Sequence, residues 1–181
     1  MPNESQTILD SCVLLNLAAS DEMADIIATI EGATFICSAA RKEALYLRDE
    51  ADPAVLVPLD LNDLLASAQI RVCDLATPEE DNEFVRLAAD LDDGEAMSIA
   101  IATSRGMRFA SDDQKARRIF LELVPAIDRL TSTSSLLKQW AERRAVAAPR
   151  IKTVLKRIGT RARFMPSRRD PNAEWWHQCV A

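Results

Sequence analysis

Short apolar runs alternate along the chain with longer segments in which apolar residues recur every three or four positions. The runs are typical of buried β-strands, and the longer segments are typical of helices with one buried face. The predicted strands are 6–9, 33–37, 70–75, 107–110 and 124–130. The predicted helices are 13–19, 21–30, 38–49, 60–67, 77–91, 95–105, 114–123, 131–143 and 150–159.

This order of elements predicts an α/β fold. Strands alternate with helices, and no tight hairpin signal joins two strands. The alternation favours a three-layer architecture with a mostly parallel central sheet of about five strands flanked by helices. In such sheets functional side chains gather at the carboxyl ends of the strands.

Composition narrows the class of protein. The 181 residues suffice for one sizeable core, and 48% of them are hydrophobic. The N-terminus has no basic leader and the apolar run after Asp10 is too short to span a bilayer, so we expect a cytoplasmic protein outside the membrane. The cysteines form no Cys-x-x-Cys pair, which is typical of reduced, core-filling residues.

His177 is the only histidine in the chain. A histidine-rich zinc site is therefore excluded, and most serine or cysteine hydrolase arrangements lack their usual base. If the protein is an enzyme, carboxylates must carry the chemistry.

Asp10 is the first carboxylate of interest, because it interrupts an apolar run between Thr7 and Leu17. An ionised carboxylate is rarely buried without a partner, since hydrocarbon neighbours do not replace its lost hydration. Two interpretations stay open: Asp10 either caps the helix that follows or shares a metal ion with other acids.

Glu43 is the second, because its neighbours one helical turn away are small or apolar: Ala39, Ala40 and Leu47. We expect it to face inward from the helix at 38–49. The alternative is a surface glutamate that pairs with a nearby arginine or lysine.

Further acids lie at helix starts. Glu95 begins a small, apolar helix typical of a protein centre, where it either forms a capping box with Asp92 or faces a metal ion. Asp112 and Asp113 follow the strand at 107–110, and they again fit a helix cap or a metal site.

Four segments carry these acids: Ile8-Leu9-Asp10-Ser11, the helix with Glu43, Asp92-x-Gly94-Glu95-Ala96, and Ser111-Asp112-Asp113-x-x-Ala116-Arg117. In this order and context they resemble the small prokaryotic members of the PIN-domain nuclease family. The resemblance covers roughly residues 6–135 and implies a PIN-like three-layer fold. It also implies a metal-dependent ribonuclease, which in many members is the toxin of a toxin–antitoxin pair.

The resemblance also implies roles for individual residues. By position, the catalytic acids would be Asp10, Glu43, Glu95 and Asp113. The metal ligands would be Asp10, Glu95, Asp112 and Asp113, and the metal Mg²⁺ or Mn²⁺. Ser11 and Ser111 would orient a carboxylate or a water molecule. Typical members have aspartate where this chain has Glu95.

The chemistry of such a site agrees with the residues present. Mg²⁺ and Mn²⁺ prefer oxygen ligands and need few carboxylates. A bound ion can activate water and neutralise charge on a phosphate, and this requires no histidine. Four crowded acids without a metal would repel one another, which predicts raised pKa values.

The C-terminal part differs in charge. Ten of the 22 Lys and Arg residues lie between Arg143 and Arg169, a stretch with no acidic residue. We therefore predict a PIN-like nuclease domain at 1–145 and a basic helix and tail at 146–181. One interpretation is an arm that holds RNA through Arg150, Lys152, Lys156, Arg157, Arg161 and Arg163.

Two alternatives for this tail stay open. The helix at 150–159 could dock its apolar stripe on the acidic body, with its charges solvated or paired. It could also bind an antitoxin or a second copy of the chain, with Trp175 and Trp176 as anchors.

The expected function is thus a metal-dependent endoribonuclease, the toxin of a toxin–antitoxin pair, with RNA as substrate and an antitoxin protein or a homodimer mate as partners. The alternative is a non-catalytic PIN-like module that binds RNA or protein, against which the intact acids count. A phosphotransfer enzyme would need Asp-x-Asp after the first strand, and Asp10-Ser11-Cys12 does not supply it.

Overall fold

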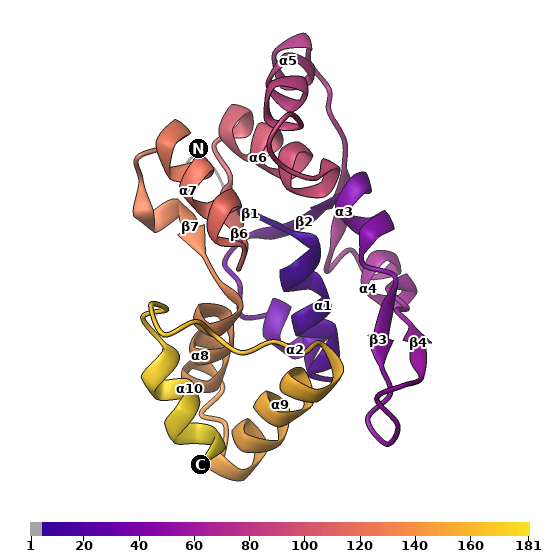
Figure 1. Cartoon of the computed structure of the whole chain (residues 1–181), viewed down its shortest axis with the longest axis vertical. Coiled ribbons are helices and arrows are strands. Elements are labelled where there is room, and N and C mark those ends of the chain that lie inside the picture. The colour runs from indigo at the N-terminus through magenta and orange to yellow at the C-terminus, as the bar shows by residue number, and fades with distance from the viewer. Residues whose placement is uncertain (1–4) are drawn as a thin grey trace.

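The computed structural model describes residues 5–181, and its centre is a five-stranded sheet in the order β5-β2-β1-β6-β7 (Figure 1). Every pair of neighbouring strands in this sheet is parallel. The predicted α/β fold with a mostly parallel central sheet flanked by helices is therefore confirmed. The strands are β1 (Gln6–Leu9), β2 (Ala33–Cys37), β5 (Arg71–Cys73), β6 (Arg108–Ala110) and β7 (Leu130–Thr131).

Helices cover both faces of the sheet and make three layers. Successive residues of β1 point to opposite sides, so Leu9 enters one hydrophobic core and Ile8 the other. The core around Leu9 is completed by α1 (Ser11–Ala19), α2 (Met23–Ile27), α4 (Asn62–Ala66), α8 (Thr133–Arg143), α9 (Ala148–Arg161) and α10 (Ala173–Val180). The core around Ile8 is completed by α3 (Ser38–Glu43), α5 (Pro78–Leu87), α6 (Asp93–Arg105) and α7 (Gln114–Leu123).

The prediction of one helix over 38–49 is wrong in its second half. The helix α3 ends at Glu43, and β3 (Tyr46–Arg48) then pairs antiparallel with β4 (Leu56–Pro58) as a separate hairpin. Here exposed and buried side chains alternate with the period of a strand, since Tyr46 is exposed and Leu47 is buried. The Asp49 carboxylate accepts the N–H groups of Ala51 and Asp52 and so forms the turn, which carries no glycine and therefore gives no tight hairpin signal in the sequence.

Three further boundaries differ from prediction. Most of 124–130 is irregular loop and the 3₁₀ helix η1 (Ile127–Arg129), because Ile127 is 68% exposed and cannot serve as a core position. The helix at 21–30 shortens to α2, since Asp21 has a φ of 59°. Gly159 lies within α9 and does not end it.

The C-terminal segment packs onto the body of the protein. Val154, Leu155 and Ile158 of α9 are buried in the same core as α1 and α8, and Trp176 of α10 is only 2% exposed. The two helices lie at the end of the molecule opposite to α5 (Figure 1). The structure thus shows the docked arrangement of the apolar stripe.

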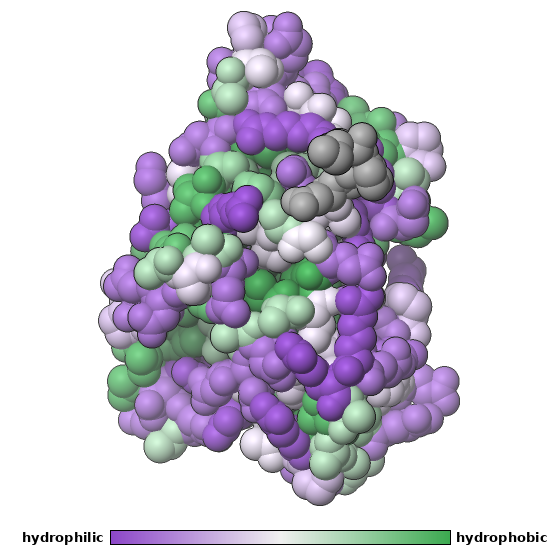
Figure 2. All heavy atoms as spheres, turned by 180° about the vertical axis from the view of Figure 1, so that it is seen from behind, coloured by the Kyte–Doolittle hydropathy of each residue, from purple (hydrophilic) through white to green (hydrophobic). Residues whose placement is uncertain are grey.

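Polar residues cover much of the rear face, and apolar residues lie between them in smaller groups (Figure 2). Among the helices of residues 5–181, none has the length and apolar character needed to cross a membrane.

Candidate functional site

The central strands β1 and β6 bring two of the predicted segments together at the carboxyl edge of the sheet. Leu9 pairs with Ala110 in register, and the N–H of Asp10 donates to the carbonyl of Ala110 at 2.9 Å. The chain leaves β1 through Asp10 into α1, and it leaves β6 through Ser111 into α7. Residues about 100 positions apart therefore share one small region.

Asp10 is 1% exposed and caps α1. Its Oδ1 accepts the N–H of Ser11 at 2.7 Å, and its Oδ2 accepts the Cys12 thiol at 3.1 Å and the Ser111 hydroxyl at 2.9 Å. Burial raises the pKa of Asp10 to about 6, although these three hydrogen bonds act to lower it. The cap is confirmed, and the carboxylate is also buried without an ion pair to any cationic side chain of residues 5–181.

Ser111 links this carboxylate to the next segment. Its hydroxyl donates to Asp10 and accepts the N–H of Asp113 at 3.1 Å. Both hydrogen-bonding directions of the hydroxyl are therefore in use, and they fix the start of α7 relative to Asp10. This orienting position is the one predicted for Ser111, and Ser11 contributes through its backbone N–H.

Glu43 reaches the start of α6 from the end of α3. Its Oε1 accepts the N–H of Gly94 at 2.8 Å. A Cβ at position 94 would lie 2.2 Å from Glu43 Oε2, so only glycine allows this approach. Although much of Glu43 is exposed, partial burial is the largest cause of its raised pKa, with Asp92 and Asp93 adding repulsion.

Asp92 and Glu95 divide their roles. Asp92 caps α6, because its Oδ1 accepts the N–H of Glu95 at 2.8 Å. The side chain of Glu95 is partly buried, and its pKa is raised to about 7 by burial and by the charges of Asp92, Asp10 and Asp113. The carboxylates of Asp10, Asp92 and Asp113 thus lie within electrostatic reach of Glu95, and these four acids are called the acidic cluster below.

Asp113 and Asp112 differ in how firmly they are held. Asp113 caps α7 and accepts the N–H groups of Lys115 and Ala116 with one oxygen, Oδ1, at 2.8 and 2.9 Å. Asp112 uses both oxygens: Oδ1 accepts the N–H of Thr133 at 3.0 Å, and Oδ2 accepts Asn16 Nδ2 at 2.9 Å and the Thr133 hydroxyl. Burial raises the pKa of Asp112, and these hydrogen bonds oppose the rise.

The cluster carries uncompensated negative charge. Within residues 5–181, the ion pairs of the protein involve none of Asp10, Glu43, Glu95 and Asp113. Their oxygens are hard donors of the kind that Mg²⁺ and Mn²⁺ prefer, and a cation would relieve the repulsion that raises the pKa of Glu95. The donor set therefore fits such an ion.

The side chains are nevertheless not arranged as a finished metal site. In the part of the chain that the structure describes, no three His, Cys, Asp or Glu side chains are placed to share one metal ion. Asp10 and Asp112 point their oxygens at protein donors. To bind a metal ion, the side chain of Glu95 or of Asp113 would have to change rotamer.

Three residues at this edge were not singled out as site residues from the sequence. Asn16 and Thr133 hold Asp112, and Arg117 donates to the carbonyls of Ser111 and Thr131 at 2.7 Å. Asn16 interrupts the apolar face of α1, a signal comparable to that of Asp10. The partners of Asn16 lie about 100 positions away, so this signal does not say what Asn16 binds.

Several predicted RNA-binding residues are engaged by the body. Arg150 pairs with Glu22, Arg157 with Asp21 and Glu50, and Arg161 with Asp21. Lys152 donates to the carbonyl of Ala181 at 2.7 Å. Lys156 and Arg163 are exposed and form no ion pair within residues 5–181.

Comparison of the chain with protein-family models, with curated proteins and with solved structures finds no match. The expected likeness to PIN-domain nucleases therefore rests on the sequence motifs alone.

Proposed function

We propose that this protein is a metal-dependent ribonuclease of the PIN type, in which the cluster of Asp10, Glu95 and Asp113 holds Mg²⁺ or Mn²⁺. The observation that supports this most is the convergence of acids from three separated segments at the carboxyl edge of a parallel sheet, with no basic residue paired to them in the described chain.

A bound divalent ion would supply an activated water and charge neutralisation at the phosphate. The protein's own groups would do the positioning. The Ser111 hydroxyl and the Ser11 N–H hold the Asp10 carboxylate in one orientation. Gly94 holds Glu43 at the edge of the cluster, where its raised pKa suits it to accept a proton from water.

The test is cleavage of end-labelled single-stranded RNA by purified protein with Mn²⁺, with Mg²⁺ and with EDTA. Asp10→Asn keeps the size of the side chain and removes its charge, and Asp63→Asn is the matched control on the exposed start of α4. We expect metal-dependent cuts by wild type and by Asp63→Asn, and at least about a hundredfold slower cutting by Asp10→Asn. Equal cutting by all three proteins, or cutting that EDTA does not stop, would refute the assignment.

The toxin role follows from the same proposal. Expression in bacteria should arrest growth with wild type and not with Asp10→Asn, and a co-expressed antitoxin should relieve the arrest. If cells that express the wild-type protein grow normally although their extract cleaves RNA, the nuclease activity stands and the toxin role is refuted.

One observation favours a second candidate, a non-catalytic module that binds RNA or protein. The described side chains do not form a ready-made set of three metal ligands. RNA binding without cuts under any metal condition, and without Mn²⁺ binding, would support this module.

A further inference from the structure

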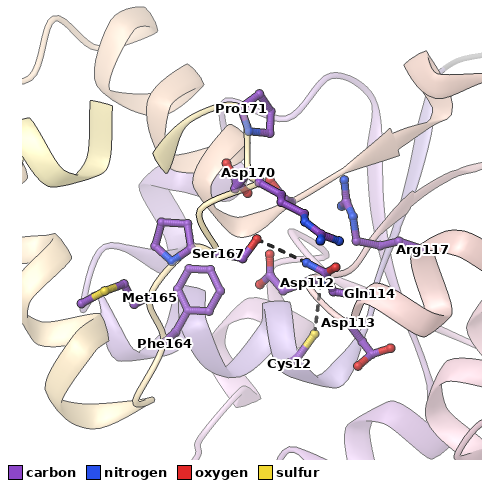
Figure 3. A pocket seen from close by; sticks show the side chains of 13 residues that line it. Cys12, Asp112, Asp113, Gln114, Arg117, Phe164, Met165, Ser167, Asp170 and Pro171 are labelled. Atoms are coloured by element: carbon purple, nitrogen blue, oxygen red, sulfur yellow. Dashed lines mark hydrogen bonds between the residues drawn. The ribbon is translucent and has the colours of Figure 1, made fainter. Parts of the chain in front are cut away.

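A pocket of about 550 Å³ lies beside the acidic cluster (Figure 3). Its size is typical of sites for small organic groups. Asp113 of the cluster lines the pocket, and so does Cys12, whose thiol donates to Asp10. A group that fills the pocket therefore lies next to the carboxylates proposed to act on a phosphodiester.

The opposite wall is the loop 164–171 between α9 and α10. In Figure 3 the side chains of Phe164 and Ser167 lie across the pocket from Asp112 and Gln114. The basic C-terminal segment thus contributes to the site through this loop, and not through the paired arginines of α9.

The loop is held in place at both ends. The Phe164 ring packs edge-on against the buried Trp176, with ring centroids 5.5 Å apart. Asp170 accepts the Ser134 hydroxyl and the N–H of Asn172, each at 2.7 Å. Gln114 Nε2 donates to the Ser167 hydroxyl at 3.2 Å across the mouth. These contacts hold the wall of the pocket in place.

The lining favours a neutral, planar group over a phosphate. Three carboxylates face two arginines, Arg117 and Arg169, so the walls carry excess negative charge. An anion inside would be repelled, whereas a group with N–H donors would not. Phe164 offers an aromatic ring, and stacking on such a ring is the usual way in which proteins hold an unpaired base.

We infer that this pocket binds one unpaired nucleobase of a single-stranded RNA whose neighbouring phosphate lies at the acidic cluster. The inference rests on the proposed function and adds its substrate class, RNA with at least one base free to leave the stack. Arg169 lines the pocket, is exposed and forms no ion pair within residues 5–181, so it is available to a phosphate of the same strand.

The experiment measures binding apart from cleavage. A fluorescent, uncleavable 2′-O-methyl octanucleotide is titrated into the full-length protein in EDTA, beside the same sequence in a duplex. Phe164→Leu keeps the apolar contact with Trp176 and removes the aromatic face. Arg169→Ala is matched by Arg168→Ala, which removes the same charge next to the pocket but does not line it.

We expect the single strand to bind more tightly than the duplex. Phe164→Leu should weaken that binding by about fivefold or more, as the loss of one stacked base does. Arg169→Ala should weaken binding by about threefold, and Arg168→Ala clearly less. The melting temperature of Phe164→Leu, measured alongside, must stay within a few degrees of wild type.

Equal losses for Arg168→Ala and Arg169→Ala, or unchanged binding by Phe164→Leu, would overturn the pocket assignment even if the protein cuts RNA. If Phe164→Leu and Arg169→Ala lose RNA binding selectively but the wild-type protein never cuts RNA, the base pocket is upheld and the nuclease is refuted.

Discussion

Asp10→Asn should remove the pH dependence of stability at this site. In the folded protein burial raises the pKa of Asp10 from 3.8 to about 6, so the folded form holds this proton over a range in which the unfolded chain has lost it. The neutral carboxyl is therefore the form that folding favours. Its stabilising effect is complete below about pH 4 and is lost as the pH rises through 6.

The magnitude follows from the pKa change. One pKa unit corresponds to about 1.4 kcal/mol, so ionised Asp10 costs the metal-free protein roughly 3 kcal/mol above pH 7. Asparagine carries no charge, but when its Oδ1 accepts the N–H of Ser11, its Nδ2 stands in place of Oδ2 and cannot accept the hydrogen bonds of Ser111 and Cys12, a loss of about 1–2 kcal/mol. Asp10→Asn should thus be more stable than wild type by about 1–2 kcal/mol at pH 8 and less stable by up to about 1 kcal/mol at pH 4.5, where about 2 of the 3 kcal/mol have been regained by protonation of wild-type Asp10.

The assay is urea unfolding in EDTA between pH 4.5 and 8, followed by the fluorescence of the buried Trp140 and Trp176. The difference between the wild-type and Asp10→Asn curves isolates the contribution of Asp10, and Asp63→Asn serves as the exposed control. Free energies of unfolding that run parallel in wild type and Asp10→Asn across this range would refute the reasoning.

Two further predictions concern neighbouring groups. Gly94→Ala should displace Glu43 and slow RNA cleavage by about tenfold or more, because the new Cβ would lie 2.2 Å from Glu43 Oε2. The control Gly159→Ala, with no atom nearer than 3.8 Å outside its helix, should leave cleavage unchanged, and equal rates for all three proteins would contradict the role of Gly94. Thr133→Val should lower the free energy of unfolding by about 1–3 kcal/mol in urea titrations, since Asp112 loses a buried donor. A loss below about 0.5 kcal/mol would show that Asp112 does not depend on Thr133.

Local patterns predicted much of the fold and the helix caps of the site. Asp10, Asp92 and Asp113 each stand directly before a helix and cap its N-terminus in the structure. Such caps can be recognised in the sequence because they join residues at most three positions apart. The order of strands and helices likewise predicted a parallel sheet, since parallel strands need long crossovers.

Features that depend on distant partners were not predictable in this way. Asn16, Asp112 and Thr133 form one network although up to 117 positions separate them. The hairpin β3–β4 replaced the second half of a predicted helix, because the burial of Leu47 against other elements outweighs local helix preference. The pocket beside Asp113 depends on where loop 164–171 docks, which no motif records.

Binding of Mn²⁺ to the metal-free protein, followed by the electron paramagnetic resonance signal of the free ion, tests the central claim most directly. We expect saturable binding at pH 8 by wild type and by Asp63→Asn, weakened about tenfold or more in Asp10→Asn and in Glu95→Gln. Binding should also weaken as the pH falls below 7, because protons then compete for Glu95 and Asp10. No saturable binding by wild type, or equal affinity in all four proteins, would contradict a metal-dependent site at this cluster.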